Sequence, residues 1–256
     1  MKTKYSLSFL IIFCLSVFAY SNTSQQVEKK RKVKVLLAGD STMQDVDHSR
    51  SLDWGWGQVL PCYFDDTIEI INFARGGRST RSFTEEGRWD KLIAEAGSGD
   101  YVFIQFGHND AAENKPERYT PVNQYREYLV KFVTESREKG ATPILVTPVT
   151  RRKFKDGKLI GGHGDYTVAV KEIAKDMNVL MIDLEAKSMD LVTSFGEEKS
   201  KEIYMHLEPG VYELAPEGKT DNTHFSRYGA YKMAGLIVGG INELKLEALQ
   251  KALLSR

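Results

Sequence analysis

Five short apolar runs lie between residues 33 and 182, and each of them predicts a buried β-strand. They are rich in Val, Ile and Leu, and few polar residues interrupt them. Strands of this kind are typical of parallel sheets that are covered by helices on both faces. The predicted strands are residues 33–38, 68–73, 101–106, 142–146 and 179–182.

Segments with apolar residues at helical spacing lie between and after these runs. Residues 119–139 form one such segment and end at a glycine, which predicts a helix. Residues 166–177 predict a second helix, and a last one begins at Phe225, although Gly239 and Gly240 weaken its middle. The alternation of strands and helices predicts an α/β fold, namely a three-layer α/β/α sandwich around a five-stranded parallel sheet.

Composition agrees with one folded domain and narrows the possible partners. The chain has 256 residues, of which 41% are hydrophobic and 27% charged. This length is enough for one large domain with a full core. The 35 basic and 35 acidic side chains balance, and this argues against general nucleic-acid binding, which usually requires a basic excess.

The N-terminus predicts export. Two lysines precede an apolar run over residues 7–18, and this pattern predicts a signal peptide over residues 1–20. The run is too short for a comfortable membrane span, so no membrane attachment is expected after cleavage; an uncleaved anchor is the alternative. Residues 21–32 are polar and predict a disordered lead-in, which leaves residues 33–256 as a single domain. We therefore expect a secreted or periplasmic protein.

Cysteine and histidine spacing indicates neither a disulfide nor a metal site. Removal of a signal peptide would take Cys14 away and leave Cys62, which we interpret as a small core residue. His163 and His206 have no evident partners, and no Cys/His/Asp spacing suits a metal ion. We therefore expect no metal and no other cofactor.

Polar, glycine-bearing motifs follow the predicted strands, at the edge where sites form in open parallel sheets. GDSTM (residues 39–43) follows the first strand and places the Ser41 hydroxyl at a sharp turn, as a nucleophile requires. The alternative is a serine that caps a helix. Asp40 precedes the serine, and we expect it to order the turn.

Two further motifs predict donors for an oxyanion. ARGGRS (residues 74–79) follows the second strand, and Gly77 in it would let a backbone N–H approach another group closely. GHND (residues 107–110) follows the third strand, and Asn109 would offer a side-chain N–H. A tight turn and an Asx-turn are the respective alternatives. We expect His108 to be structural.

DNTHFSRYGA (residues 221–230) completes the set. His224 would act as a general base, and Asp221 would orient its ring. The alternative is a polar cap, with Asp221, Thr223 or Ser226 capping the last helix. With Ser41 as nucleophile, the oxyanion donors would be the N–H groups of Ser41 and Gly77 and the amide of Asn109.

These motifs resemble those of the SGNH (GDSL-type) hydrolases, in which Ser41, Gly77, Asn109 and His224 match the four residues of the family name. The chain is most similar to the rhamnogalacturonan acetylesterase branch, in GDSTM, in Gly-Trp-Gly at 55–57, in NFARGGRSTRSFTEEGRW, in QFGHND and in DNTHFSRYGA. The resemblance covers roughly residues 33–245. It implies a flavodoxin-like α/β/α fold and metal-free serine esterase chemistry through an acetyl-enzyme. The implied substrate is acetylated pectic polysaccharide or oligosaccharide.

Two other classes of function stay open. One is an SGNH esterase that acts on another acyl ester, such as acetylated xylan, a lipid or a thioester. A lipid-acting enzyme should carry an apolar lid or an amphipathic stretch, and the sequence has no convincing one. The other is a non-catalytic carbohydrate binder on the same fold, which would have no use for a nucleophile and a base.

Candidate substrate-binding residues lie at the Gly-Trp-Gly motif and after the Gly-Gly pair. Trp54 and Trp56 would stack on sugar rings or else belong to the core. Arg78 and Arg81, with Arg88, would pair with galacturonate carboxylates, or else form salt bridges with Glu85 and Glu86. The loop 151–165 is particular to this chain and leaves the exact sugar open.

Overall fold

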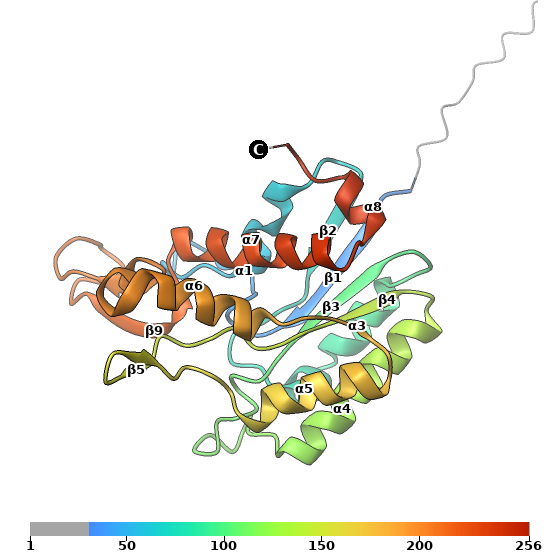
Figure 1. Cartoon of the computed structure of the whole chain (residues 1–256), viewed down its shortest axis with the longest axis horizontal. Helices are drawn as coiled ribbons and strands as arrows, with labels where there is room; N and C mark the ends of the chain where they lie inside the picture. The colour runs from blue at the N-terminus through green and yellow to red at the C-terminus, as the bar shows by residue number, and fades with distance from the viewer. Residues whose placement is uncertain (1–30, 256) are drawn as a thin grey trace, which may run out of the picture. The chain divides into compact units, whose positions relative to one another are not determined.

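Five parallel strands form the central sheet, in the order β2-β1-β3-β4-β7 (Figure 1). Each strand agrees with its predicted run to within one residue at either end. The strands are β1 (Val33–Gly39), β2 (Ile68–Asn72), β3 (Tyr101–Gln105), β4 (Thr142–Val146) and β7 (Leu180–Ile182). The predicted fold class is therefore confirmed, and the strand order is that of flavodoxin-like sheets.

The structure is a computed structural model that describes residues 31–255. The predicted signal peptide and most of the predicted lead-in lie outside the described residues. From Arg31 onward the chain forms one compact unit. No helix in the described part of the chain is both long enough and apolar enough to cross a membrane.

Helices cover both faces of the sheet and give the three predicted layers (Figure 1). Side chains of β1 alternate between the layers, with Val35 and Leu37 in one core and Leu36 and Ala38 in the other. The first face carries α1 (Trp56–Val59), α6 (Leu184–Lys199), α7 (Arg227–Glu243) and α8 (Glu247–Lys251). The second face carries α2 (Thr80–Glu85), α3 (Arg88–Glu95), α4 (Val122–Glu138) and α5 (Asp165–Asp176).

The predicted helices are present, but the last one differs in its bounds. It begins at Arg227, where the Ser226 hydroxyl accepts from the N–H of Gly229 at 3.1 Å, and it is divided into α7 and α8. The glycine pair does not interrupt α7. A Cβ at Gly240 would lie 2.7 Å from Ile182 of β7, so the glycine lets the helix pack closely on the sheet.

Two hairpins extend the same end of the unit, on the side of the strands' carboxyl ends (Figure 1). One is β5 (Phe154–Lys155) with β6 (Lys158–Leu159), inside the loop 151–165. The other is β8 (Tyr204–Leu207) with β9 (Lys219–Phe225), which the hydrophobic pattern does not predict because β9 is largely polar. Short 3₁₀ turns, η1 (Leu60–Tyr63) and η2 (Ser200–Glu202), complete the described elements.

Cys62 is an exception to the predicted core. It is exposed on η1, and its sulfur accepts from the Tyr231 hydroxyl at 3.4 Å. The prediction that it is a small core residue is wrong. Its apolar neighbours in sequence suggested burial, but the 3₁₀ turn directs this position outward.

Candidate active site

The turn after β1 presents Ser41. Asp40 is completely buried, and its carboxylate accepts from the N–H and the hydroxyl of Thr42 at 2.9 and 2.8 Å. Its carbonyl oxygen accepts from the N–H groups of Met43 and Gln44 at 3.2 and 3.1 Å. These bonds hold a tight turn, as predicted for Asp40, and Ser41 lines a cleft at its outer side.

Ser41, His224 and Asp221 form a continuous hydrogen-bonded row. The Ser41 Oγ lies 2.9 Å from Nε2 of His224, and Nδ1 of the same ring lies 2.7 Å from Oδ2 of Asp221. The other carboxylate oxygen of Asp221 accepts from the N–H groups of Thr223 and His224 at 2.8 and 3.0 Å. This is the geometry of a nucleophile, a base and the group that orients the base.

A bulge in β9 brings Asp221 and His224 together. Residues three apart on a regular strand point to opposite faces. Here the pairing with β8 jumps, since Tyr204 faces Phe225 whereas the next residue, Met205, faces Asp221. The residues from 222 to 224 therefore form extra length on one strand, as in a β-bulge, and this length turns the histidine back toward the aspartate. The alternative of a helix cap applies to Ser226 and not to Asp221.

The pair also shifts both pKa values in the direction that a triad requires. Burial raises the pKa of Asp221, but hydrogen bonds and charge from His224 outweigh it and hold the pKa well below its ordinary value. Burial lowers the pKa of His224, and the hydrogen bond and charge of Asp221 outweigh it and raise the pKa above its ordinary 6.5. The aspartate is therefore ionised whenever the histidine titrates.

The predicted oxyanion donors line the same cleft. Gly77 has φ +79°, a left-handed conformation that favours glycine. The backbone N–H groups of Gly77 and Ser41 have no acceptor within residues 31–255. The side-chain amide of Asn109 donates one hydrogen to the Arg78 carbonyl at 2.9 Å, which orients the amide. Its second hydrogen is then available to a ligand, since an amide nitrogen has two.

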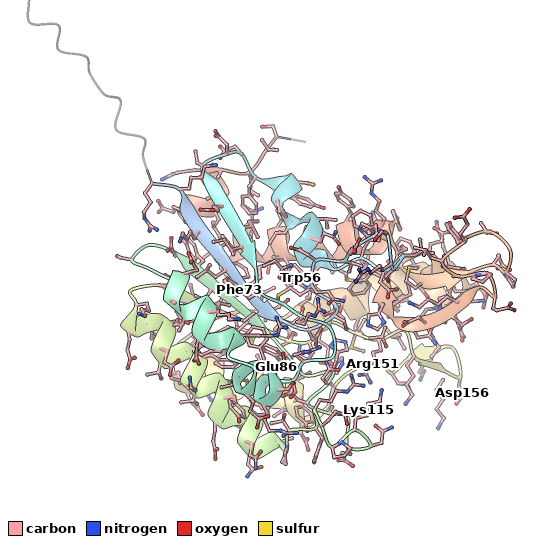
Figure 2. The ribbon with its side chains drawn as sticks, turned by 180° about the vertical axis from the view of Figure 1, so that it is seen from behind. Trp56, Phe73, Glu86, Lys115, Arg151 and Asp156 are labelled. Carbon is pink, nitrogen blue, oxygen red and sulfur yellow. The ribbon has the colours of Figure 1, made fainter. Side chains whose placement is uncertain are left out.

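The cleft is open, polar and basic. It has a volume of about 680 Å³, and its largest side chains are charged or polar. Asp221 is the single carboxylate in its described lining, against three basic side chains that sequence reasoning did not select: Lys115, Arg118 and Arg151. Figure 2 labels Lys115 and Arg151, which lie close to one another. Arg151 lies in the basic loop after β4, so the rule that sites follow parallel strands would have found it.

A buried group of titratable side chains lies beneath this lining. Nδ1 of His108 is 3.3 Å from Oδ2 of Asp40. The His108 and His163 rings pack edge to face, with 4.3 Å between their centroids. Burial raises the pKa of Asp40, but the His108 charge and the bonds from Thr42 outweigh it and lower the pKa. Burial and the charges of His108 and Arg151 hold the pKa of His163 well below 6.5. His108 thus connects the turn that carries Ser41 with the Asn109 loop.

The two candidate tryptophans have different environments. Trp56 is completely buried, and its Nε1 donates to the Gln105 side chain at 2.8 Å. The alternative that Trp56 belongs to the core is therefore confirmed, and stacking on a sugar is excluded because the ring is completely buried. Trp54 is half-buried; its ring stacks on His48 at 4.0 Å between centroids, and the Arg227 guanidinium lies 5.3 Å from its centroid. Trp54 does not line the cleft, and its contact with substrate stays a prediction.

The candidate arginines already have partners. Arg78 pairs with Glu86 at 2.9 Å, and Arg81 lies 3.6 Å from Glu85. Arg88 also pairs with Glu86, at 2.7 Å. The salt-bridge alternative is therefore confirmed. None of these arginines lines the cleft, so a contact of Arg78 or Arg81 with substrate stays a prediction.

In the described part of the chain, no three His, Cys, Asp or Glu side chains are placed to hold a metal ion. His206, for which the sequence showed no evident partner, has one in the structure, since its Nε2 lies 2.9 Å from the Asn222 side-chain oxygen.

Comparison with known proteins adds three findings. The profile of the GDSL-like Lipase/Acylhydrolase family matches residues 37–230. The probable rhamnogalacturonan acetylesterase YesY of Bacillus subtilis is 42% identical over 87% of this chain and 98% of that protein. Rhamnogalacturonan acetylesterase RhgT of the same organism is 41% identical over 89% of this chain and 97% of that protein. The crystal structure of Bacillus subtilis protein YXIM superposes with a TM-score of 0.72 at 26% identity, over 85% of this chain and 58% of that one.

Proposed function

The chain belongs to the GDSL-like lipase/acylhydrolase (SGNH) family and is a carboxylic ester hydrolase, and we propose that it removes O-acetyl groups from pectic polysaccharide of the rhamnogalacturonan type. The observation that carries this proposal is the row of Ser41, His224 and Asp221 in an open, polar cleft. The names of the two relatives support the choice of substrate.

The proposed reaction follows from the distances in the row. The Ser41 Oγ attacks the acetyl carbonyl while Nε2 of His224, at 2.9 Å, accepts its proton. Asp221 stabilises the imidazolium that forms, because its carboxylate already holds Nδ1 at 2.7 Å. His224 then gives the proton to the leaving sugar hydroxyl, and Ser41 keeps the acetyl group. Water, activated by the same histidine, attacks this acetyl-enzyme and releases acetate.

The oxyanion of each tetrahedral intermediate would be stabilised by the N–H groups of Ser41 and Gly77 and by the amide of Asn109. All three residues line the cleft, and none of the three N–H donors needs to break an existing bond to serve. Donors that are already oriented are effective because they require no reorganisation when the charge develops.

The lining of the cleft favours a short acyl group on a polar alcohol. Its apolar side chains are only those of Ala111 and Ala112 among fifteen lining residues, so a long lipid chain would find little apolar surface to bury. An acetyl group needs no such surface. The same observation argues against the lipid alternative.

Export is part of the proposal. It is supported by the charged and apolar pattern of residues 1–20, and it suits an enzyme whose substrate is a plant cell-wall polymer. Sequencing the N-terminus of the protein recovered from the periplasm and from the medium of an expressing bacterium tests it; a product that retains residues 1–20 and stays in the cytoplasm would contradict it.

The experiment that tests the function is acetate release from acetylated rhamnogalacturonan, acetylated xylan and a small aryl acetate, with Ser41→Ala as the control. We expect release from the pectic polymer that disappears in the variant. Release from the aryl acetate alone, or from xylan at a higher rate, would keep the esterase and discard the pectic substrate. No release from any ester would favour the non-catalytic carbohydrate binder.

A further inference from the structure

Three basic side chains of the cleft have no part in the proposed hydrolysis. Lys115 and Arg118 lie on the loop between β3 and α4, and Arg151 lies on the loop that follows β4. Figure 2 shows Lys115 and Arg151 on neighbouring loops, and both line the same cleft as Ser41. The two loops are far apart in the sequence, and they meet because β3 and β4 are adjacent in the sheet.

Both guanidinium groups lie beside the oxyanion donors. A Cβ placed on Gly77 would be 3.3 Å from Nη1 of Arg118, so this arginine covers the glycine. Nη2 of Arg151 donates to the carbonyl of His108 at 3.1 Å, directly before Asn109 in the chain. A sugar whose acetyl group enters the oxyanion site would therefore lie against both arginines.

The charge of these arginines is poorly compensated. The Nε atoms of Arg118 and Arg151 are shielded from solvent and have no hydrogen-bond acceptor among the described residues. The carboxylate nearest to Arg118 is that of Glu117, 3.8 Å from Nε and 69% exposed. Asp221, the one carboxylate of the lining, is already bound by His224. Outside the cleft, by contrast, Arg78 holds Glu86 at 2.9 Å.

A guanidinium group that lines a cleft and has no close carboxylate partner in the protein can gain one from a ligand that enters the cleft. Burial lowers the pKa of Arg151, opposed by the charge of Asp40, but a guanidinium remains protonated at any physiological pH. The ligand group that suits two adjacent guanidinium groups best is a planar anion with two oxygens, since it accepts parallel N–H bonds.

We propose that Arg118 and Arg151, with Lys115 at the rim, form a carboxylate-binding subsite that holds a uronic acid unit of the substrate next to Ser41. The subsite rests on the proposed ester hydrolysis at Ser41, and it would give that reaction its selectivity among acetylated sugars. Esters on uronic acid sugars are bound and turned over in preference to esters on neutral sugars. Neutral acetylated sugars offer the two guanidinium groups no carboxylate to pair with.

A matched pair of substrates tests the subsite. Acetylated oligogalacturonate is compared with the same oligosaccharide after methyl esterification, which removes the carboxylate charge and leaves the acetyl groups. We expect kcat/KM of the wild-type protein to be at least about tenfold higher for the free acid, in line with the loss of one charge-assisted hydrogen bond. We also expect this preference to fall when the ionic strength rises from 0.02 to about 0.5 M, because salt screens exposed charges.

Variants assign the preference to residues. Arg118→Gln and Arg151→Gln should each reduce the ratio of the two kcat/KM values toward one, and Lys115→Gln should reduce it less because Lys115 is exposed. Arg50→Gln is the matched control, since the Arg50 side chain is 85% exposed and lies outside the cleft lining. It should leave the ratio unchanged.

The outcomes separate the subsite from the esterase. A wild-type ratio near one, together with Ser41-dependent acetate release, overturns the subsite and leaves the proposed function in place. A ratio that survives in both arginine variants also overturns it. No release from either oligosaccharide or from an aryl acetate overturns the proposed function itself. The wild-type ratio and its salt dependence test the subsite even where a variant fails to fold, because they require no variant.

Discussion

Arg152 donates twice to Asn222, from its backbone N–H to the carbonyl at 2.8 Å and from Nη1 to the side-chain oxygen at 3.1 Å. Asn222 follows Asp221 in the bulge of β9 and is the first of the extra residues. The same guanidinium donates to the Ser200 hydroxyl at 3.1 Å and to the Glu197 carbonyl. A buried arginine from the loop after β4 thus holds the bulge that aligns the candidate triad.

Arg152→Met should therefore lower both stability and turnover. Loss of the guanidinium removes the donor to the buried Ser200 hydroxyl and to the part-buried oxygens of Asn222 and Glu197, at a cost of about 1–3 kcal/mol in the free energy of unfolding. Release of the bulge should lower kcat on an aryl acetate more than it raises KM. Urea unfolding and steady-state kinetics measure the two effects, with Lys153→Met, an exposed neighbour, as the control. A folded Arg152→Met protein with full kcat would contradict a positioning role.

Asn109→Ala should reduce kcat about a hundredfold or more and leave a residue of activity, because one of three oxyanion donors is lost. KM should change little, since the donor acts mainly on the charge of the transition state. Steady-state kinetics on an aryl acetate measure both constants. Asn114→Ala removes an amide that lines the same cleft and serves as the control. Equal effects of the two substitutions would remove Asn109 from the oxyanion site.

The pH dependence of kcat/KM should follow His224. The base must be neutral, so activity rises with pH through its pKa, which Asp221 raises above 6.5. Asp221→Asn removes the charge that raises this pKa. The acidic limb should then move to lower pH, and kcat should fall by roughly three to four orders of magnitude. A limb that stays in place in the variant would show that another group titrates.

Asp110 should make stability fall as the pH rises through the neutral range. Its carboxyl is completely buried, and burial raises its pKa to about 7. The hydrogen bonds from Thr80 oppose this rise, and the negative charge of Asp40 adds to it. Because the folded pKa exceeds the unfolded one, the folded state binds the proton more tightly. The stabilisation is complete below about pH 4 and is lost as the pH rises toward 7.

Asp110→Asn cannot ionise, so its free energy of unfolding relative to the wild type should increase between pH 5 and pH 8. The slope should reach at most about 1.4 kcal/mol per pH unit. Urea unfolding at several pH values measures it, and Asp156→Asn, at an exposed turn of the β5–β6 hairpin, is the control (Figure 2). A difference that is constant with pH would mean that Asp110 is ionised throughout this range.

Trp56→Phe should affect stability and not substrate binding. The ring is completely buried, and removal of its N–H leaves the Gln105 side-chain oxygen without its donor, at about 1–3 kcal/mol. Gln105 in turn donates to the hydroxyl of Thr42, the residue after Ser41, at 2.7 Å. Thermal unfolding and KM on the acetylated polymer distinguish the two roles. An unchanged melting temperature with a raised KM would return Trp56 to the substrate site.

The sequence by itself determined the layers of the fold and which motifs meet at the edge of the sheet. Continuous apolar runs mark strands buried on both faces, because each side chain of such a strand meets a covering helix. Parallel strands also end at one edge, so motifs that follow them were expected to converge, as Ser41, Gly77 and Asn109 do in the cleft. These features depend on local periodicity and chain direction, and both can be read from the sequence.

Only the tertiary structure decided which side chains face the cleft. Asp221 and His224 meet through a bulge whose register depends on pairing with β8, and the polar pattern of β9 does not encode that register. Trp56 and the arginines at 78 and 81 are bound by side chains of the protein, whereas the Nε atoms of Arg118 and Arg151 have no hydrogen-bond acceptor among the described residues. Burial and pairing are set by contacts between residues far apart in the chain, so residue type and spacing alone do not determine them.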